Sequence, residues 1–400
     1  MAGAPPKRLL TRHERLQRIA AALPDVISFA GGLPDPELFP ERELCAAFRH
    51  AMLSHGRTAL QYGWPEGSLC LRRYVAALLG ARGADVDPKT VIITSGAQQA
   101  IALTLTALRR GPRFVFATER ECYPGALDAA RARGATFASL EARADVYYVM
   151  PEVSNPRGQR LSERERSELL ERARAHDSCI IEDDAYAETA FSGELSRPLL
   201  ADAPERVFQI GTFSKTLCPG LRIGWLVPPP RFARRILRAK QTQDLEANGL
   251  SQSILEAYLA TGHYAHHLQR SRHHYARRAR LLFDAVQAQL PSFVCGFPRG
   301  GFSLWLEAPF SGDDQELLEL AIAEGTSFDP GSLFRREPRS NLALRLSYSA
   351  LSDDEIASAL PRLARAVNDH IRRRPCSTNR SRAPNRPSSD PAGFVRSQKW

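Results

Sequence analysis

A lysine lies in a turn rich in hydroxyl groups and glycine, within the segment Gly211-Thr-Phe-Ser-Lys-Thr-Leu-Cys-Pro-Gly-Leu-Arg222. The amine of Lys215 can bind an aldehyde as an imine. Arg222 follows after a Pro-Gly turn, and with Thr212 and Ser214 it can bind a dianionic phosphate through charge-assisted hydrogen bonds. A lone lysine in a Ser-Lys-Thr turn indicates little, so its meaning depends on the other residues of the set.

A second phosphate-binding element is expected at residues 95–99, Ser-Gly-Ala-Gln-Gln. This segment joins a predicted strand to a predicted helix over residues 100–108. The backbone amides of Ala97 and Gln98 would therefore lie at a helix N-terminus, where anions bind. The alternative is that Ser95 is an ordinary helix N-cap.

Adjacent acids end a strand of buried character, in the segment Glu182-Asp-Asp-Ala-Tyr186. Carboxylates in such a place lose hydration unless a cation pairs with them. A pyridinium nitrogen would supply that cation. An ionised Asp183 would keep this nitrogen protonated, and the ring would then be an electron sink for a carbanion at a substrate α-carbon. Metal binding is the competing use of these acids, but no histidine lies nearby in the sequence, so no metal is expected.

Asn155 and Tyr186 carry donors suited to the same ring. Asn155 follows another predicted strand in the segment Pro151-Glu-Val-Ser-Asn-Pro-Arg-Gly158, and its amide can donate to a phenolate oxygen, as can the hydroxyl of Tyr186. Taken alone, Asn-Pro is only a turn signal.

Short apolar runs alternate with helical patterns between about residues 90 and 230, which predicts βαβ units and a mainly parallel sheet. Ligands of such sheets lie at the carboxyl ends of the strands, so the segments above are expected around one site. Helices are expected within 231–290 and over 314–324 and 353–367, with apolar runs at 302–306 and 342–348 that indicate an α+β C-terminal part. The predicted strands of the main sheet are 91–94, 113–117, 145–150, 179–183, 207–211 and 223–227.

The composition fits a globular protein of two domains, with 400 residues, 43% hydrophobic and 24% charged. No apolar run is long enough to span a membrane, and the seven cysteines are scattered, which favours a reducing, cytoplasmic location. The net charge of +10 is concentrated from Arg372 onward, where eight basic residues and one acidic residue indicate a disordered basic tail. Such a tail can contact nucleic acid by charge alone, but a solvated extension is preferred.

The ordered set of motifs resembles the fold-type I, pyridoxal 5'-phosphate (PLP) dependent aminotransferases of class I/II. The resemblance is to the branch with 2-aminoadipate and kynurenine aminotransferases and the C-terminal domain of MocR-type regulators. It covers roughly residues 10–367. The matching segments are Ile27-Ser-Phe-Ala-Gly-Gly-Leu-Pro-Asp-Pro-Glu-Leu-Phe-Pro40, Gln61-Tyr-Gly-Trp-Pro-Glu-Gly67, Thr94-Ser-Gly-Ala-Gln-Gln99, Tyr123-Pro-Gly-Ala126, Ser154-Asn-Pro156, Ile181-Glu-Asp-Asp-Ala-Tyr186, Gly211-Thr-Phe-Ser-Lys-Thr216, Pro219-Gly-Leu-Arg222, Gly300-Gly301 and Leu344-Arg-Leu-Ser347.

The resemblance implies an α/β fold with a mostly parallel seven-stranded sheet in a large domain and a smaller α+β C-terminal domain. It divides the chain into an N-terminal arm over the active site (1–40), the PLP-binding domain (41–280), the small domain (281–371) and the tail (372–400). It also implies a homodimer, because Tyr62 and the arm containing Gly31-Gly32 act across the subunit interface in the family.

The resemblance assigns a role to each site residue. Lys215 is implied as the Schiff-base lysine and the acid-base catalyst, Asp183 as the partner of the ring nitrogen, and Tyr123 as the residue stacked on the ring. Arg345 is implied as the bidentate clamp on the substrate α-carboxylate, with Gly32 and Asn155 beside it. The implied phosphate ligands are Ser95, Ala97, Gln98, Ser214 and Arg222, with Tyr62 from the neighbouring subunit, and the implied ring-oxygen ligands are Asn155 and Tyr186.

The expected reaction is transfer of an amino group between an L-amino acid and a 2-oxo acid, with 2-oxoglutarate as the usual acceptor in the family. Two alternatives stay open. The same cofactor site could support decarboxylation, elimination or racemisation, since the reaction depends on which α-carbon bond lies perpendicular to the ring. The other alternative is a ligand-sensing domain of a MocR-type regulator. Such regulators carry a DNA-binding domain before this fold, and the few residues that precede Ile27 argue against one here. One departure from the family is Arg157, where threonine is commoner.

Overall fold

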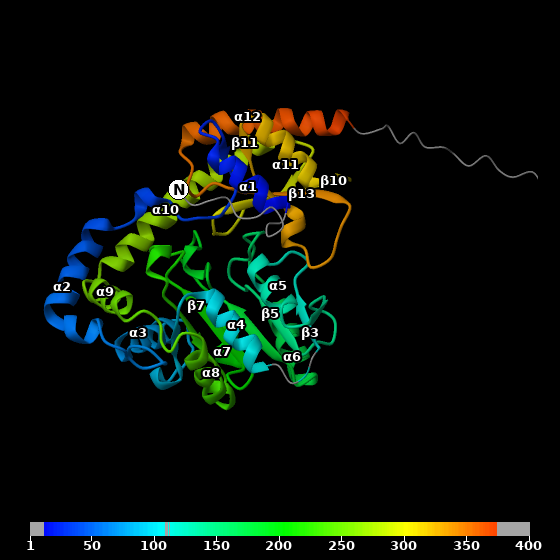
Figure 1. Ribbon diagram of the computed structural model, residues 1–400. Helices are drawn as coiled ribbons and strands as arrows, with labels where there is room; N and C mark the ends of the chain where they lie inside the picture. Colours follow the sequence, from blue (N-terminus) through cyan, green and yellow to red (C-terminus); the bar gives the residue numbers. More distant parts are fainter. Residues whose placement is uncertain (1–11, 109–110, 112, 374–400) are drawn as a thin grey trace, which may run out of the picture.

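The computed structural model describes residues 12–108, 111 and 113–373, and in this part of the chain the strands form a seven-stranded, a four-stranded and a two-stranded sheet (Figure 1). The seven-stranded sheet has the order β2-β8-β7-β6-β5-β3-β4, and only β8 runs antiparallel to its neighbours. The mostly parallel sheet is therefore confirmed. Its strands are β2 (Ile92–Thr94), β3 (Phe114–Thr118), β4 (Ala135–Ala138), β5 (Val146–Val149), β6 (Cys179–Asp183), β7 (Val207–Thr212) and β8 (Gly224–Val227).

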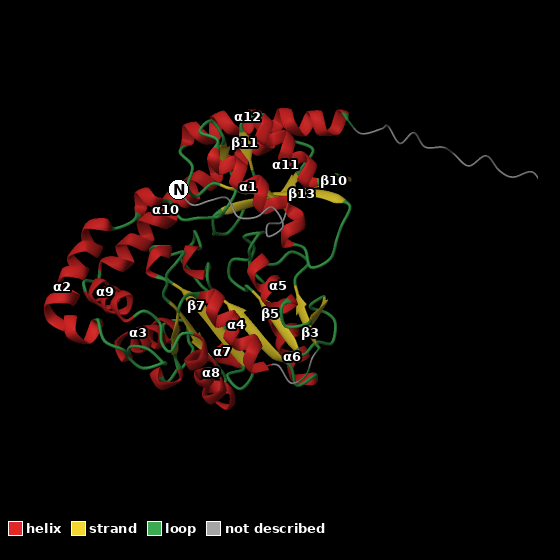
Figure 2. Cartoon of the chain, in the orientation of Figure 1, coloured by secondary structure: helices red, strands yellow, loops and turns green. Residues whose placement is uncertain are grey.

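Helices cover both faces of this sheet, as Figure 2 shows. Residues of its strands alternate between two hydrophobic clusters, with Ile181 in one and Ile180 in the other. This double burial explains why the strands read as continuous apolar runs. The first face is covered by α4 (Ala97–Leu108), α5 (Pro124–Arg131) and α8 (Pro230–Gln243), and the second by α3 (Leu69–Gly80), α6 (Glu163–Ala175), α7 (Leu199–Asp202) and α9 (Gly249–Ala260).

The C-terminal part is an antiparallel four-stranded sheet with the order β12-β13-β10-β9, packed against helices. Ser352 and Glu355 form a capping box at the start of the last helix, α12. This helix continues five residues beyond the predicted end at Val367, because its apolar face extends to a buried His370. The elements are β9 (Val294–Cys295), β10 (Ser303–Ser311), α11 (Asp314–Ala323), β12 (Asp329–Pro330), β13 (Asn341–Ser347) and α12 (Asp353–Arg372).

The N-terminal segment packs on the C-terminal part, far from it in sequence. Helix α1 (Arg12–Ala22) precedes β1 (Ile27–Ser28), which pairs in parallel with β11 (Thr326–Ser327). Helix α2 (Glu41–Ala59) then lies against α9 at the left of Figure 1. The 3-10 turns are η1 (Pro36–Leu38), η2 (Pro88–Thr90), η3 (Ala187–Thr189), η4 (Pro219–Leu221) and η5 (Gly331–Phe334).

The long helix α10 (His263–Gln289) runs from α9, at the left of Figure 1, to the C-terminal part, where it packs against α12 and β10. Read from the sequence, the run of histidines in this helix favours a solvated linker helix over a metal site, and the structure contradicts full solvation at two of them. His267 is buried, which lowers its pKa to about 4, and His274 bonds to Asp35 at 3.0 Å. The predicted boundary at residue 280 falls inside α10, and the division into domains stays a prediction.

Among the described residues, no helix is long and apolar enough to cross a membrane.

Candidate active site

A cavity of about 740 Å³ lies where the carboxyl ends of the parallel strands face the C-terminal sheet. Asp183 is the last residue of β6, Thr212 ends β7, and Arg222 precedes the antiparallel β8. The fold thus brings together side chains that are far apart in sequence, as the strand topology predicts. The predicted site residues that line the cavity are Ala97, Gln98, Tyr123, Asn155, Asp183, Tyr186, Ser214, Lys215, Arg222 and Arg345.

Lys215 extends from the turn after β7 into this cavity. Its Nζ donates to the backbone oxygen of Gly32 at 3.1 Å and lies 5.4 Å from the ring centre of Tyr186. Within the turn, Thr212 Oγ1 lies 3.0 Å from Ser214 Oγ and accepts from the Ser214 backbone N–H at 3.1 Å. These bonds fix the turn, so the amine points toward the N-terminal segment that covers the cavity.

Asp183 is a buried carboxylate that accepts two hydrogen bonds. Oδ2 accepts from the hydroxyl of Tyr148 at 2.7 Å, and Oδ1 accepts from the backbone N–H of Ala185 at 3.0 Å. Burial raises the pKa of Asp183 to about 6, although both hydrogen bonds lower it. A cation placed beside this carboxylate would favour its ionised form. Tyr148 was missed at the sequence level because it reads there as one more apolar strand residue.

The segment predicted to bind phosphate is a strand-to-helix turn, as expected, but the prediction does not hold in the same way for Ser95. Helix α4 begins at Ala97, and its Gln99 and Ala100 amides already donate to the Gly96 backbone oxygen, so the amides that face forward are those of Ala97 and Gln98. Arg222 Nη2 donates to the Ser95 backbone oxygen at 3.0 Å. The hydroxyl of Ser95 bonds to Asp244 at 3.2 Å and does not line the cavity. The hydroxyl points away from the cavity because Asp244 lies beside the loop. The Nζ of the buried Lys240 donates to Asp244 Oδ1 at 2.8 Å and holds this carboxylate in place.

Arg345 projects from β13 and is already paired. Its Nε and Nη2 donate to Oδ2 of Asp329 at 3.1 and 2.6 Å, and its Nη1 donates to Oδ1 of Asn155 at 3.0 Å. The guanidinium lies 4.6 Å from the ring centre of Phe334. A Cβ on Gly32 would come within 3.3 Å of Arg345, so glycine is needed for the close approach of the N-terminal segment. Sequence reasoning missed Asp329, whose only signal is the turn Asp-Pro-Gly.

The two predicted tyrosines outside β6 and its loop differ in position. Tyr123 lines the cavity, and burial raises its pKa to about 12, which keeps the phenol neutral. Tyr62 lies outside the cavity with 79% of its surface exposed. Its expected role across a subunit interface stays a prediction.

Arg157, the departure from the family pattern, does not line the cavity. Its Nε bonds to Glu121 at 2.8 Å and its Nη2 to Glu307 at 3.2 Å. Arg120 contacts the same two acids. This cluster joins the loops that carry Tyr123 and Asn155 to β10 of the C-terminal sheet.

Comparison with known proteins identifies the family to which this geometry belongs. The family model for aminotransferase class I and II matches residues 25–363. The chain belongs to the class I and II aminotransferases. It is similar to a 2-aminoadipate transaminase of Thermus thermophilus, with 33% identity over 86% of this chain and 90% of the relative. It is also similar to aromatic-amino-acid aminotransferase 1 of Thermococcus litoralis, with 31% identity over 87% of this chain and 89% of the relative.

A solved aminotransferase structure shows the same fold. The kynurenine aminotransferase of Pyrococcus horikoshii, solved with PMP, superposes with a TM-score of 0.84 at 29% identity over 90% of this chain and 95% of that chain. The expected fold-type I architecture is thereby confirmed. The expected relation to regulators is also found, since an uncharacterized HTH-type transcriptional regulator of Escherichia coli is 32% identical over 87% of this chain and 78% of its own length.

Pyridoxal 5'-phosphate is the cofactor of these aminotransferases, and the cavity fits it. Arg222 and the first turn of α4 offer cationic and amide donors for a phosphate. The buried Asp183 can accept a hydrogen bond from a pyridinium nitrogen, and the amine of Lys215 lies in the same cavity. In the described part of the chain, no group of three or more histidine, cysteine or acidic residues is arranged to hold a metal ion.

Proposed function

We propose that the aminotransferase activity of this chain resides in the cavity around Lys215 and uses 2-oxoglutarate as the amino acceptor. The observation that carries the proposal is that an amine from the turn after β7, a buried carboxylate from β6 and a paired guanidinium from β13 converge there. PLP supplies an electron sink for the electron pair left when a substrate loses its α-proton.

Each protein group has a separate task in this proposal. The Lys215 amine would accept the α-proton of the substrate as general base and would then, as general acid, deliver it on the far side of the amino nitrogen, which is a 1,3-proton shift. Asp183 holds a proton at the ring nitrogen, and its bond from Tyr148 fixes the direction of that carboxylate. Asn155 accepts from Arg345 through Oδ1, which leaves its amide nitrogen to donate to the ring oxygen. Tyr123, which lines the cavity, would pack against the ring.

Arg345 binds the α-carboxylate of the substrate in this proposal. We expect Arg345→Lys to raise KM for the amino acid roughly 10- to 100-fold, because a lysine ammonium cannot reproduce the planar two-point contact of arginine. The fall in kcat should be smaller. Steady-state kinetics with one amino acid at several concentrations measures both constants. Arg365→Lys on exposed α12 is the matched control. An unchanged KM together with weakened PLP binding would contradict the assignment.

The direct test of the proposed reaction is a half-reaction. Holoenzyme is mixed with one amino acid at a time, and the 2-oxo acid formed is measured against the enzyme present. Aromatic and dicarboxylic substrates belong in the panel, because the cavity is lined by Leu33, Leu333 and Phe334 as well as by Arg131. One 2-oxo acid per site, with the cofactor aminated and then restored by 2-oxoglutarate, supports the proposal. Release of carbon dioxide, ammonia or the D-amino acid instead supports the alternative reactions.

We also propose a homodimer, as expected from the sequence. Large hydrophobic side chains are exposed on α2 and the loop after it, with Leu53 88%, Tyr62 79% and Trp64 77% exposed. Apolar surface of this extent is typical of an interface. In the dimer Tyr62 reaches the phosphate of the neighbouring site. Sedimentation of the holoenzyme at twice the mass of 44.4 kDa is the expected result. The cytoplasmic location stays a prediction.

A further inference from the structure

Three consecutive acids stand at the end of β6, and they face opposite sides of the sheet. Asp183 points into the cofactor cavity, whereas Glu182 and Asp184 lie on the other face. All three are buried. Adjacent buried carboxylates repel one another, so each needs a partner of its own.

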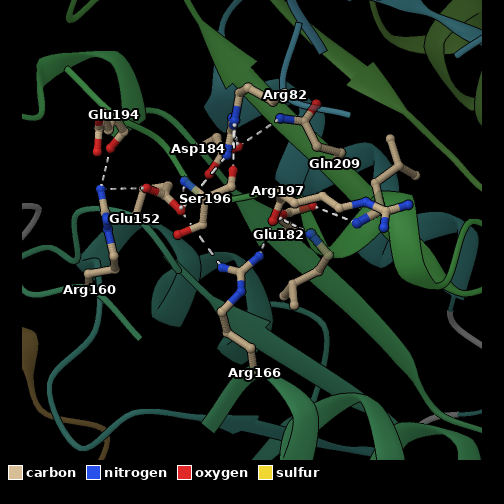
Figure 3. Close-up of polar contacts among 12 residues, drawn as sticks. Arg82, Glu152, Arg160, Arg166, Glu182, Asp184, Glu194, Ser196, Arg197 and Gln209 are labelled. Carbon is tan, nitrogen blue, oxygen red and sulfur yellow. Dashed lines mark hydrogen bonds and ion pairs between the residues drawn. The ribbon is translucent and has the colours of Figure 1, made fainter. Parts of the chain in front are cut away.

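The chain provides those partners on the far face, as Figure 3 shows. Glu182 accepts from the backbone N–H groups of Leu199 and Leu200 at 2.7 and 3.0 Å. Asp184 accepts from Arg82 Nη1 at 2.6 Å and from Gln209 Nε2 at 3.3 Å. Arg82 is thus the cation that compensates Asp184 directly.

Arg82 also joins the loops that carry the cofactor ligands. It lies in the loop after α3, and its side chain is 10% exposed. Its Nε donates to the Ser196 backbone oxygen at 3.2 Å, and its Nη2 lies 4.0 Å from Glu152. Glu152 stands in the loop after β5, three residues before Asn155. One guanidinium therefore contacts both the loop of Asp183 and the loop of Asn155 from behind the sheet.

The neighbouring Glu152, unlike Asp184, is surrounded by several arginines. Glu152 has two more arginines, since Arg160 lies at 3.2 Å and Arg166 at 3.8 Å. Burial and the neighbouring Asp184 raise the pKa of Glu182. Burial, with a smaller contribution from the charge of Asp184, also raises the pKa of Glu188 on the 3-10 turn η3. The charge of Asp184 therefore acts on its neighbours, and among the described residues its carboxylate forms an ion pair with Arg82 alone.

We propose that Arg82 is a positioning residue for the cofactor site, which acts through Asp184 to keep Asp183 ionised and correctly placed. This inference rests on the proposed role of Asp183 at the ring nitrogen. The groups that act on Asp183 directly are Tyr148 from β5, the Ala185 amide and the charge of Asp184. Tyr123 and Cys122, from the loop after β3, also interact electrostatically with its carboxylate. Loss of the Arg82 cation leaves the negative charge of Asp184 uncompensated next to Asp183, which favours protonation of Asp183 and weakens its hold on a pyridinium.

The test compares Arg82→Gln, Asp184→Asn and the double variant with the unaltered protein. Two quantities are measured: the affinity of the apoprotein for PLP, by fluorescence titration, and the pH at which the holoenzyme releases its cofactor on acidification. We expect Arg82→Gln to weaken PLP binding at least about tenfold at pH 7 and to raise the pH of release by about one unit. The double variant should return both quantities close to those of Asp184→Asn, because the repelling charge is gone.

Controls separate this role from general destabilisation. Arg160→Gln removes a cation that contacts Glu152 but not Asp184, and it should leave the pH of cofactor release unchanged. Arg82→Lys keeps the charge and should recover most of the affinity. If Arg82→Gln does not fold, Asp184→Asn alone must still lower the pH of release. An unchanged pH of release in Arg82→Gln, or the same loss in the double variant, overturns the proposal. PLP affinity does not depend on the reaction catalysed, so a failure here is distinct from a failure of the aminotransferase assay.

Discussion

Replacement of Lys215 by alanine is expected to reduce kcat by at least about 10⁴-fold. Proton transfer by a positioned side chain contributes typically 10²–10⁴-fold, and this variant also loses the amine that binds the cofactor covalently. Lys215 is the lysine whose Nζ opens into the cavity, 3.1 Å from the Gly32 oxygen. The measurement is a single-turnover rate together with the visible absorption of the purified protein.

Lysine residues elsewhere provide the comparison. Lys89 is exposed in η2, and Lys89→Ala should retain both the absorption of the bound cofactor and the activity. Lys215→Ala should still bind PLP without the covalent bond, because Arg222, Asp183 and the α4 N-terminus remain. A Lys215→Ala protein with an unchanged absorption spectrum would show that another lysine holds the cofactor.

The second large effect is expected for Asp183→Asn. An amide cannot stabilise a protonated ring nitrogen as a carboxylate does, and loss of one preorganised electrostatic group of this kind costs roughly 10²–10³-fold in kcat. The bond from Tyr148 can persist, since the substituted side chain retains one carbonyl oxygen. Rates with a saturating amino acid measure the effect. A variant with nearly full activity would mean that the ring nitrogen has another partner.

The same substitution should affect the stability of the apoprotein in the opposite direction. Burial raises the pKa of Asp183 from 3.8 to about 6. The folded apoprotein therefore binds this proton more tightly than the unfolded chain. Its stability falls as the pH rises from about 4 to 6, by about 3 kcal/mol in total, and the penalty remains at higher pH.

Asp183→Asn removes this penalty but loses one acceptor, which costs about 1 kcal/mol. Above pH 7 the variant apoprotein should therefore be more stable by roughly 1–2 kcal/mol, and below pH 4 it should be less stable than the unaltered apoprotein. Urea unfolding of both apoproteins at several pH values measures the difference. A constant difference across this pH range would contradict the raised pKa. Burial also raises the pKa of Glu182 and of Glu119, in the loop after β3, but both residues are present in both proteins, so their contributions cancel in the comparison.

Much of the fold followed from local pattern. The six predicted strands of the main sheet agree with the structure within one residue at each end, because buried parallel strands have continuous apolar runs bounded by polar loops. Helix ends were less certain. The buried face of α12 continues through Val367 to His370, and the helix extends with it, although an exposed, charged sequence surrounds His370.

The sequence correctly predicts that Lys215 and Asp183 come together, because both lie at or just after the carboxyl ends of parallel strands and both line one cavity. The site was not predictable where a partner comes from a distant element. Ser95 bonds to Asp244, which is 149 residues away in the chain, and Arg345 pairs with Asp329 on an adjacent strand. Tyr148 and Arg82 likewise act on the β6 end through contacts that only the folded chain creates. Spacing within a motif carries no information about such contacts.

A single oxygen of Asp329 serves two groups. Oδ2 accepts from Arg345 and also from the backbone N–H of Gly31 at 2.9 Å. If Arg345 binds the substrate as proposed, an arriving carboxylate competes with this oxygen for the guanidinium. Binding of the carboxylate would then be coupled to the position of residues 31–33. We expect small carboxylic acids that occupy Arg345 to alter protease sensitivity at Leu33, even though they carry no amino group to transfer. Residues 31–33, which lie over the cavity, would then change position when a carboxylate binds, before any proton is transferred.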